Sequence, residues 1–234
     1  MSRRVILVQH DHGPADDRVS TWLVRNGFDP VYRRPFAGDV LEAIADDVAG
    51  SVVFGGRFEA YETGKYPFLK DEARWIEACM AKGVPLLGIC QGAQQIAHTL
   101  GARVGPQPDE RCEFGCYEIR PTAAGTGIFP QAMHVTQRHF HTFDIPRGAE
   151  RLAGSDLFAN QAFRYGGTTV AFQFHAEVTR EGFARAQDSV GAFFGRPGAQ
   201  TREEQDALLA AHDARQAVWF DGFLDGFFNG STAS

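Results

Sequence analysis

The stretch from Gly83 to Val104 constrains the fold more than any other part of the chain. The apolar run Val84 to Leu87 leads into a segment with one glycine two residues before Cys90 and another two residues after it. An amphipathic segment follows and ends at Gly101. Strand, sharp turn and helix in this order form a nucleophile elbow, here with sulfur replacing the serine oxygen. The pattern predicts a thiol at a helix N-terminus, where the reactive thiolate is favoured.

Length and charge narrow the class of protein. With 234 residues, we expect one domain, and a net charge of −6 without a basic run argues against a nucleic-acid partner. The apolar run near the N-terminus is too short for a signal peptide, and no stretch approaches the length of a membrane span. Four cysteines show no dense disulfide pattern, so we expect a reducing cytoplasm as the location and no membrane association.

Strands and helices are predicted to alternate through the first half of the chain. Apolar runs predict strands at Val5–Gln9, Pro30–Arg34 and Ser51–Phe54, followed by the strand of the elbow. Apolar spacing predicts helices at Ala15–Asn26, over the segment that carries Val40, Leu41, Ile44 and Val48, and at Pro67–Ala81. This alternation predicts an α/β fold with an open, mostly parallel sheet flanked by helices.

The second half has a different texture. Short β-like pieces, Cys116–Arg120 and Met133–Arg138, predict a small antiparallel addition, and Thr168–Phe174 is the last strong strand. Helices are expected at Thr179–Phe194 and after Thr201, where Glu204 completes a capping-box signature. We therefore expect a main domain over residues 1–195 and, over 196–234, a C-terminal helical extension packed on the same domain. The aromatic residues from Trp219 to Phe228 are expected to pack in the core, with a partner interface as the alternative.

A candidate base lies far from the thiol in sequence. In an extended chain, residues two apart point to the same side, so His175 and Glu177 are expected to emerge together where the last strand ends. Glu177 could then orient the imidazole and leave its other nitrogen facing the Cys90 thiol. Because sites in open α/β sheets form at the carboxyl ends of strands, the two motifs are expected to converge.

Acyl transfer also needs donors for a developing oxyanion. In an elbow, one donor is the N–H of the residue after the nucleophile, here Gln91. The second is expected from Gly55-Gly56, which directly follows a predicted strand and lets the backbone approach a ligand.

Taken together, these motifs resemble the class I, triad-type glutamine amidotransferases, and most of all their stand-alone, GMP-synthetase-like domains. The resemblance rests on the Gly-Gly loop, on the G-x-C-x-G-x-Q elbow from Gly88 to Gln94, and on the F-H-x-E segment. The stretches from Tyr66 to Gly83 and from His141 to Ala153 are also similar, and the likeness runs from about Ser51 to Thr179. It implies a flavodoxin-like fold.

The resemblance also implies roles for single residues. It implies a catalytic triad of Cys90, His175 and Glu177, an oxyanion hole from Gly56 and Gln91, and contact between Gln94 and the bound glutamine. The segment Arg138 to Asp144 falls where relatives hold the α-amino and α-carboxylate groups. The implied reaction passes through a γ-glutamyl thioester, with release of ammonia and then glutamate, and we expect no cofactor. One departure is Ala176, where many relatives have proline.

Two substrates remain open at this point. The first is the γ-amide of glutamine, with ammonia passing to a possible separate synthase partner, because no synthetase or ATP-binding segment is recognised in the chain. The alternative is a γ-glutamyl peptide or γ-glutamyl amine, hydrolysed by the same triad. Related protease-like and stress-protein folds often place histidine directly after the elbow cysteine, whereas this chain has Gln91 there.

The remaining cysteines and histidines carry weaker signals. Cys79 lies on an apolar helix face and is expected to be inert. Cys112 and Cys116 lack a second pair of ligands at zinc spacing, and neighbouring histidines on a strand are more often structural, so no metal site is predicted. The histidines concerned are His134, His139 and His141.

Overall fold

The computed structural model describes residues 3–189 and 193–230. Within these residues, nine strands form one sheet in the order β2-β1-β3-β4-β11-β10-β9-β6-β7. The first five strands of this order pair in parallel. They are β1 (Arg3–Val8), β2 (Phe28–Arg33), β3 (Val48–Val53), β4 (Leu86–Ile89) and β11 (Thr169–Phe172).

The parallel strands are buried on both faces, as their apolar runs predict. In β1, Val5 and Leu7 point into one core cluster, whereas Ile6 and Val8 point into a second cluster on the opposite face. Because successive side chains of a strand point to opposite faces, β1 contributes residues to both hydrophobic clusters. Each core is closed by helices.

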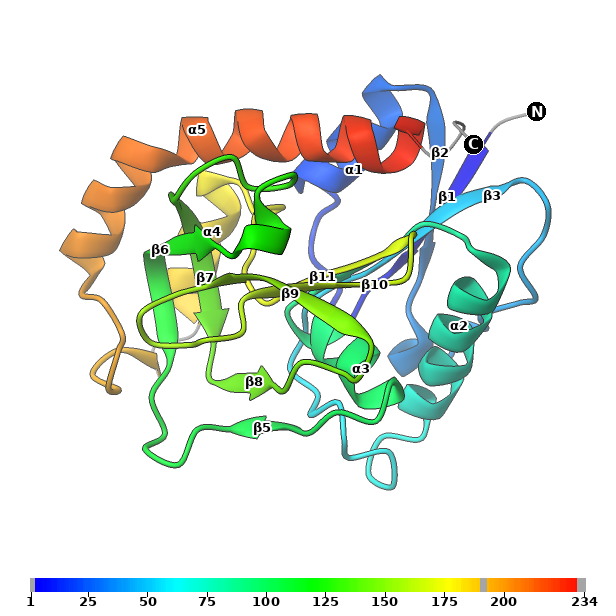
Figure 1. Ribbon diagram of the computed structural model, residues 1–234, viewed down its shortest axis with the longest axis horizontal. Helices are drawn as coiled ribbons and strands as arrows, with labels where there is room; N and C mark the ends of the chain where they lie inside the picture. Colours follow the sequence, from blue (N-terminus) through cyan, green and yellow to red (C-terminus); the bar gives the residue numbers. More distant parts are fainter. Residues whose placement is uncertain (1–2, 190–192, 231–234) are drawn as a thin grey trace.

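Helices cover both faces of the sheet (Figure 1). On one face lie α1 (Arg18–Arg25) and α5 (Arg202–Asn229), which supply buried residues to the first cluster. On the other lie α2 (Phe68–Lys82) and α3 (Gln91–Thr99). The remaining α-helix of the described residues, α4 (Arg180–Ser189), follows the end of β11.

The antiparallel half extends the same sheet. It consists of β6 (Glu113–Pro121), β7 (Met133–His139), β9 (Ala149–Gly154) and β10 (Ala162–Tyr165), and the 3-10 turn η2 (Ala123–Gly125) follows β6. A separate two-stranded sheet pairs β5 (Val104–Pro106) with β8 (His141–Phe143). The predicted fold class, an open and mostly parallel sheet with flanking helices, an antiparallel addition and a C-terminal helix, is confirmed.

The helix predicted around Val40 to Val48 is wrong. A single 3-10 turn, η1 (Pro35–Ala37), ends at Gly38, whose φ of 101° is left-handed. Val48 instead begins β3 and pairs with Arg4, while Ile44 packs with the residues of α2. The apolar spacing therefore reflects separate anchoring points of an irregular connection.

The end of the last predicted strand and the helix after it also need correction. β11 ends at Phe172 rather than Phe174, and α4 ends at Ser189 rather than Phe194. Residues 190–192 of that predicted helix lie outside the described residues. Phe193 and Phe194 lie beyond the helix and pack against Phe114.

The aromatic residues of α5 pack in the core, as predicted. Thr201 and Glu204 form the predicted capping box at the start of this helix. Phe220, Leu224 and Phe228 are fully buried, and Trp219, Phe223 and Phe227 pack on the same cluster while partly exposed. The Phe228 ring stacks on Trp22 with 5.7 Å between centroids, which anchors the C-terminal helix on α1.

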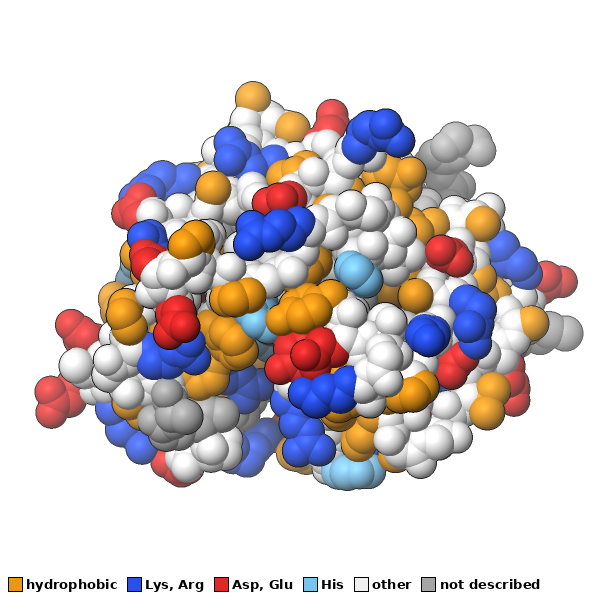
Figure 2. Space-filling view, turned by 90° about the horizontal axis from the view of Figure 1, so that it is seen from below, with side chains coloured by type: hydrophobic (Ala, Val, Ile, Leu, Met, Phe, Trp, Pro, Cys, Tyr) orange, Lys and Arg blue, Asp and Glu red, His pale blue; other side chains and the backbone are white. Residues whose placement is uncertain are grey.

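The surface seen in Figure 2 mixes acidic and basic side chains without a broad patch of one sign, with histidines between hydrophobic groups near its centre. This face shows no basic stripe of the kind that marks a nucleic-acid interface. No helix in the described part of the chain is long and apolar enough to cross a membrane.

Truncating Phe228 tests how α5 is held. We expect Phe228→Ala to lower the free energy of unfolding by about 3–5 kcal/mol, because it leaves a cavity between α5 and α1. Val218, on the same helix, is 76% exposed, so Val218→Ala should change stability by less than about 0.5 kcal/mol. Urea denaturation of both variants is the measurement, and equal small losses would show that α5 is not anchored through Phe228.

Candidate active site

Cys90 sits at a strained corner between strand and helix. It follows β4 directly and is the N-cap of α3, with φ 52° and ψ −107°. A non-glycine residue with positive φ is uncommon and persists only where its surroundings hold it. Here the Cys90 N–H donates to the Phe172 carbonyl at 2.7 Å, and the Cys90 carbonyl accepts from the N–H of Gln94 at 3.0 Å. The strained elbow predicted from the sequence is present.

The two glycines of the elbow allow strand and helix to approach closely. A Cβ atom on Gly92 would lie 1.9 Å from the Val53 carbonyl oxygen. A Cβ atom on Gly88 would lie 2.6 Å from Ile96 Cδ1. Neither position could hold a larger residue without displacing β3 or α3, so both glycines are required by packing.

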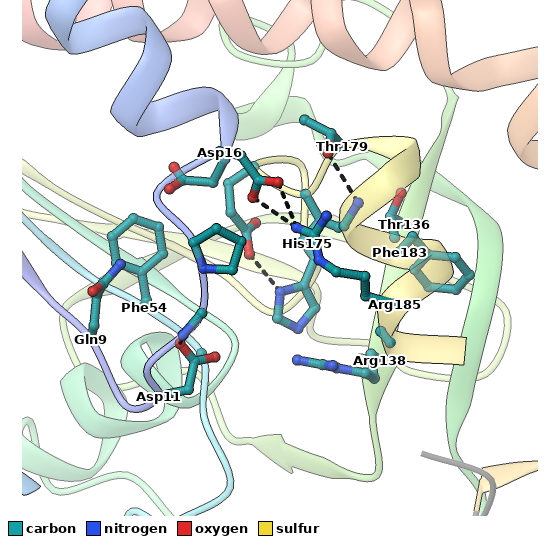
Figure 3. A pocket seen from close by; sticks show the side chains of 18 of the residues that line it. Gln9, Asp11, Asp16, Phe54, Thr136, Arg138, His175, Thr179, Phe183 and Arg185 are labelled. Atoms are coloured by element: carbon teal, nitrogen blue, oxygen red, sulfur yellow. Dashed lines mark hydrogen bonds and ion pairs between the residues drawn. The ribbon is translucent and has the colours of Figure 1, made fainter. Parts of the chain in front are cut away.

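His175 and Glu177 form a buried pair. His175 Nδ1 lies 2.7 Å from Glu177 Oε1, and this contact is one of the dashed lines in Figure 3, where His175 is labelled. The sequence predicts that these two side chains meet by alternation along an extended strand, and this part of the prediction is wrong. They follow the end of β11, and the chain turns at Ala176 and Glu177, which brings the carboxylate back to the imidazole. The predicted pairing is found, but a turn produces it.

The segment that carries this pair is clamped from outside. The Arg18 guanidinium donates to the carbonyls of Ala176 and Val178 and pairs with Asp213 of α5. The N–H of Arg18 also donates to the Glu177 carbonyl at 2.8 Å. These contacts fix the backbone around Ala176.

The thiol and the imidazole converge at Gly55. A Cβ atom on Gly55 would lie 2.8 Å from His175 Cε1 and 3.2 Å from Cys90 Cβ. His175 Nε2 is buried and has no hydrogen-bond partner among the described residues. The Cys90 thiol donates to the Arg138 carbonyl, 3.8 Å from Sγ. One imidazole nitrogen is therefore held by Glu177 while the other stays available beside the cysteine.

The electrostatics favour a charged imidazole. Burial alone would lower the pKa of His175, but its interactions with Glu177 and Cys90 outweigh this effect and raise the pKa to about 10. His175 is therefore protonated at neutral pH. Burial raises the pKa values of Cys79 and Cys116 to about 12, so these two thiols stay protonated.

The two predicted oxyanion donors lie on adjoining segments. Gln91 is the first residue of α3, where backbone N–H groups have no acceptor within the helix. A Cβ atom on Gly56 would lie 2.6 Å from Gln91 Oε1, and this oxygen accepts the N–H of Phe58 at 2.9 Å. The Gln91 side chain thus ties the glycine loop to the helix that begins next to the nucleophile.

A second buried histidine supports this loop, and the sequence analysis did not identify it. His10 follows β1, and its Nε2 lies 3.0 Å from Glu72 Oε2 of α2. Gln95 of α3 donates to the same oxygen at 2.5 Å. A Cβ atom on Gly56 would lie 2.4 Å from His10 Cβ. The position of His10 at the carboxyl end of a parallel strand was the available signal.

The thiol opens into a cavity of about 430 Å³, within the usual size range for small-molecule sites. Gln94 lines it, and its amide nitrogen lies 3.1 Å from Gln173 Oε1. Another part of the wall is formed by residues 138–141, the turn at which the end of β7 passes through Phe140 into the start of β8. Aromatic side chains complete the lining; they are Phe36, Phe58, Phe140 and Phe193.

A polar network lies behind the turn of residues 138–141. His139 Nε2 is 3.0 Å from Glu113 Oε2, and its Nδ1 is 2.9 Å from the His141 carbonyl. Glu113 also accepts from Ser155 at 2.5 Å and from Gln161 at 2.6 Å. These contacts join strands β6 and β7 to the β9–β10 connection, so they fix the backbone of the turn.

The remaining candidate ligands are used structurally. Cys112 and Cys116 are buried together in an apolar cluster, and His134 stacks on His212 at 3.9 Å. Within the described residues, no group of three His, Cys, Asp or Glu side chains could hold a metal ion.

Comparison with known proteins places this geometry in a family. The model of the glutamine amidotransferase class-I family matches residues 23–186. The glutamine amidotransferase-like protein YfeJ of Salmonella typhimurium is 31% identical over 188 residues, 76% of this chain and 77% of that protein. The GMP synthase of Porphyromonas gingivalis is 31% identical over 137 residues, which are 56% of this chain and 25% of the synthase.

Solved structures show the same likeness. A glutamine amidotransferase from Thermotoga maritima has a TM-score of 0.84 and 28% identity, covering 97% of this chain and 99% of that one. A further structure, from Methylobacillus flagellatus, has a TM-score of 0.89 at 22% identity, with 98% and 96% of the two chains covered. At that identity, the second likeness describes the fold alone.

Alkylation by iodoacetamide tests the thiolate without any substrate. Because the protonated His175 lies beside Cys90, whereas burial raises the pKa values of Cys79 and Cys116 to about 12, we expect iodoacetamide at pH 7 to label Cys90 at least about tenfold faster than either. His175→Ala should slow the labelling of Cys90. Cys79 and Cys116 are internal controls that should stay unlabelled. Peptide mass spectrometry locates the label. Faster labelling of Cys79 or Cys116 than of Cys90 would contradict the assignment of Cys90 as the reactive thiol.

Proposed function

The chain belongs to the class I glutamine amidotransferase family, and from this premise we propose that it hydrolyses the γ-amide of glutamine through Cys90. The observation that carries the proposal is an elbow thiol that borders Gly55 together with His175, whose Nδ1 pairs with Glu177. A nucleophile, a base and a group that orients the base are the parts required for covalent acyl transfer.

The first half-reaction forms a thioester. The Cys90 thiolate attacks the γ-carbonyl carbon, and the oxyanion that develops meets the N–H groups of Gly56 and Gln91. His175, protonated at neutral pH, gives its Nε2 proton to the departing nitrogen. The C–N bond breaks, ammonia leaves, and the γ-glutamyl group stays on sulfur.

The second half-reaction releases glutamate. His175, now neutral, takes a proton from a water molecule that attacks the thioester carbon, and the same two N–H groups meet the second oxyanion. The C–S bond breaks, and the thiolate and imidazolium are restored together. Glu177 keeps the imidazole oriented through both steps, because it faces Nδ1 while Nε2 exchanges the proton.

The glutamyl end is proposed to bind in the cavity beside Cys90. Gln94 and the backbone of residues 138–141 line that cavity and offer polar groups for the α-amino and α-carboxylate ends. The His139–Glu113 contact behind the turn gives this backbone one fixed geometry. Such preorganisation lowers the cost of ordering the site when substrate binds.

The destination of the ammonia is a separate proposal. The chain aligns with about a quarter of a GMP synthase whose name records glutamine hydrolysis, so a synthase on another chain is a candidate acceptor. Among the described residues the cysteines are free thiols, which supports a reducing location such as the cytoplasm.

The second candidate function, hydrolysis of a substituted γ-glutamyl amide, is favoured by a further cavity beside His175.

Triad variants test the chemistry. Cys90→Ser and His175→Ala should each lower kcat for glutamine hydrolysis by at least about 10³-fold, and Glu177→Ala by less, because it orients rather than transfers a proton. The double variant of His175 and Glu177 should be no slower than His175→Ala alone. Release of ammonia and glutamate is the measurement, with Cys79→Ala as the unaffected control. A fully active His175→Ala enzyme would contradict the assignment of Cys90, His175 and Glu177 as a catalytic triad.

Two buried glutamates allow a matched test of positioning. Glu72→Gln should lower kcat by about tenfold with little change in KM, because it loosens the loop that meets the oxyanion only in the transition state. Glu113→Gln should instead raise KM, because it loosens the turn proposed to hold the glutamyl end. Steady-state kinetics separate the two, and identical effects of both variants would show a general loss of stability instead.

A further inference from the structure

A second cavity, of about 400 Å³, lies beside His175. Figure 3 shows it between the segment that follows β1, the backbone near His175 and the first turns of α4. The Asp16–Arg185 ion pair, with N–O distances of 2.7 and 2.8 Å, joins the first of these segments to α4. Apolar side chains form part of the wall: Pro14, Phe54, Val178, Phe183 and Ala186.

The thiol and the imidazole face different cavities. Cys90, Gln91 and Gln94 line the cavity of the thiol, whereas His175 and Glu177 line the second one. The two cavities meet at a common border formed by His10, Asp11 and Arg138. The attacked carbon must therefore lie near this border, within reach of both groups.

This division separates the two halves of a substrate. The glutamyl half is held on the side of Cys90 and Gln94. The departing nitrogen must lie within reach of His175 Nε2, and a substituent on that nitrogen would extend into the second cavity. Ammonia needs a space of the order of one water molecule, about 30 Å³, so the cavity is far larger than hydrolysis of glutamine requires.

The charges around this cavity leave an excess of negative charge. Arg185 balances Asp16, and the protonated His175 balances Glu177, so Asp11 and Asp17 remain against Arg138 at the border. Glu177 Oε2 is buried without a hydrogen-bond partner in the described part of the chain. Burial and, to a smaller extent, the charge of Glu177 raise the pKa of Asp17. A cation bound here would relieve this repulsion.

We propose that the second cavity is a leaving-group subsite for γ-glutamyl amides of amines that carry a second positive charge, such as a diamine. The inference rests on the proposed function and specifies its substrate. Cys90 would take the γ-glutamyl group, His175 would protonate the departing nitrogen as the C–N bond breaks, and the free diamine would leave from the second cavity. Water then hydrolyses the thioester, as it does for glutamine.

A substrate series of equal length tests the subsite. The substrates are the γ-glutamyl amides of 1,4-diaminobutane, butylamine and 4-aminobutyrate, with glutamine alongside. We expect kcat/KM for the cationic amide to exceed that of the neutral one by about tenfold, and the anionic amide to be the poorest, because charges a few ångströms apart in a buried site interact strongly. The kcat/KM of the anionic amide, that of 4-aminobutyrate, also shows whether Arg138 at the border makes the cavity prefer a carboxylate to an ammonium group.

Variants of α4 connect the preference to the cavity. Ala186→Phe fills the cavity and should lower kcat/KM for the substituted amides by at least about tenfold while glutamine hydrolysis stays within about twofold. Arg185→Gln leaves Asp16 unbalanced and should raise kcat/KM for the cationic amide only. Arg202→Gln, which breaks the exposed Arg202–Asp188 pair outside the cavity, is the matched control. Should Ala186→Phe fail to fold, Gly182→Leu provides a second way to fill the space.

The outcomes separate this inference from the function on which it rests. Equal kcat/KM across the series, turnover of glutamine alone, or equal effects of Ala186→Phe on glutamine and on the amides would each overturn the subsite. If the unmodified protein hydrolyses neither glutamine nor any of the γ-glutamyl amides, the proposed function itself is rejected. Preference for the anionic amide would overturn the proposed charge selectivity.

Discussion

The site depends on the contact between Cys90 and His175 across Gly55. β4 and β11 are parallel neighbours, so their carboxyl ends lie at one edge of the sheet and bring together residues 85 positions apart in the sequence. The approach is possible because Gly55 presents no Cβ atom to either side chain. A glycine at position 55 is therefore needed for the thiol and the imidazole to approach each other.

Two buried histidine–glutamate contacts hold this arrangement from behind. His10 and Glu72 lie behind the glycine loop, and His139 and Glu113 lie behind the turn that forms the opposite wall of the cavity. Breaking a buried polar network leaves unpaired groups in a region of low dielectric, so such networks favour one arrangement strongly. The strained backbone at the nucleophile is thus held by hydrogen bonds to its neighbours, and the surrounding walls are held by buried polar contacts.

Local patterns in the sequence predicted much of the fold and the geometry of the elbow. Cys90 with its flanking glycines and the capping box of α5 are encoded within a few residues, and each is present. The His10–Glu72 contact joins residues from a strand end and a distant helix, so only the fold reveals it. The helix predicted around Ile44 failed because tertiary anchoring placed its apolar residues in a strand and a loop.

The most direct test of the account is to look for the γ-glutamyl thioester during turnover. Rapid acid quenching of the protein with glutamine, followed by peptide mass spectrometry, locates any covalent adduct. The account predicts one glutamyl group on the peptide that contains Cys90, appearing before glutamate and decaying at the rate of glutamate release. Glutamate release with no adduct at any quench time, or an adduct confined to Cys112 or Cys116, would contradict it.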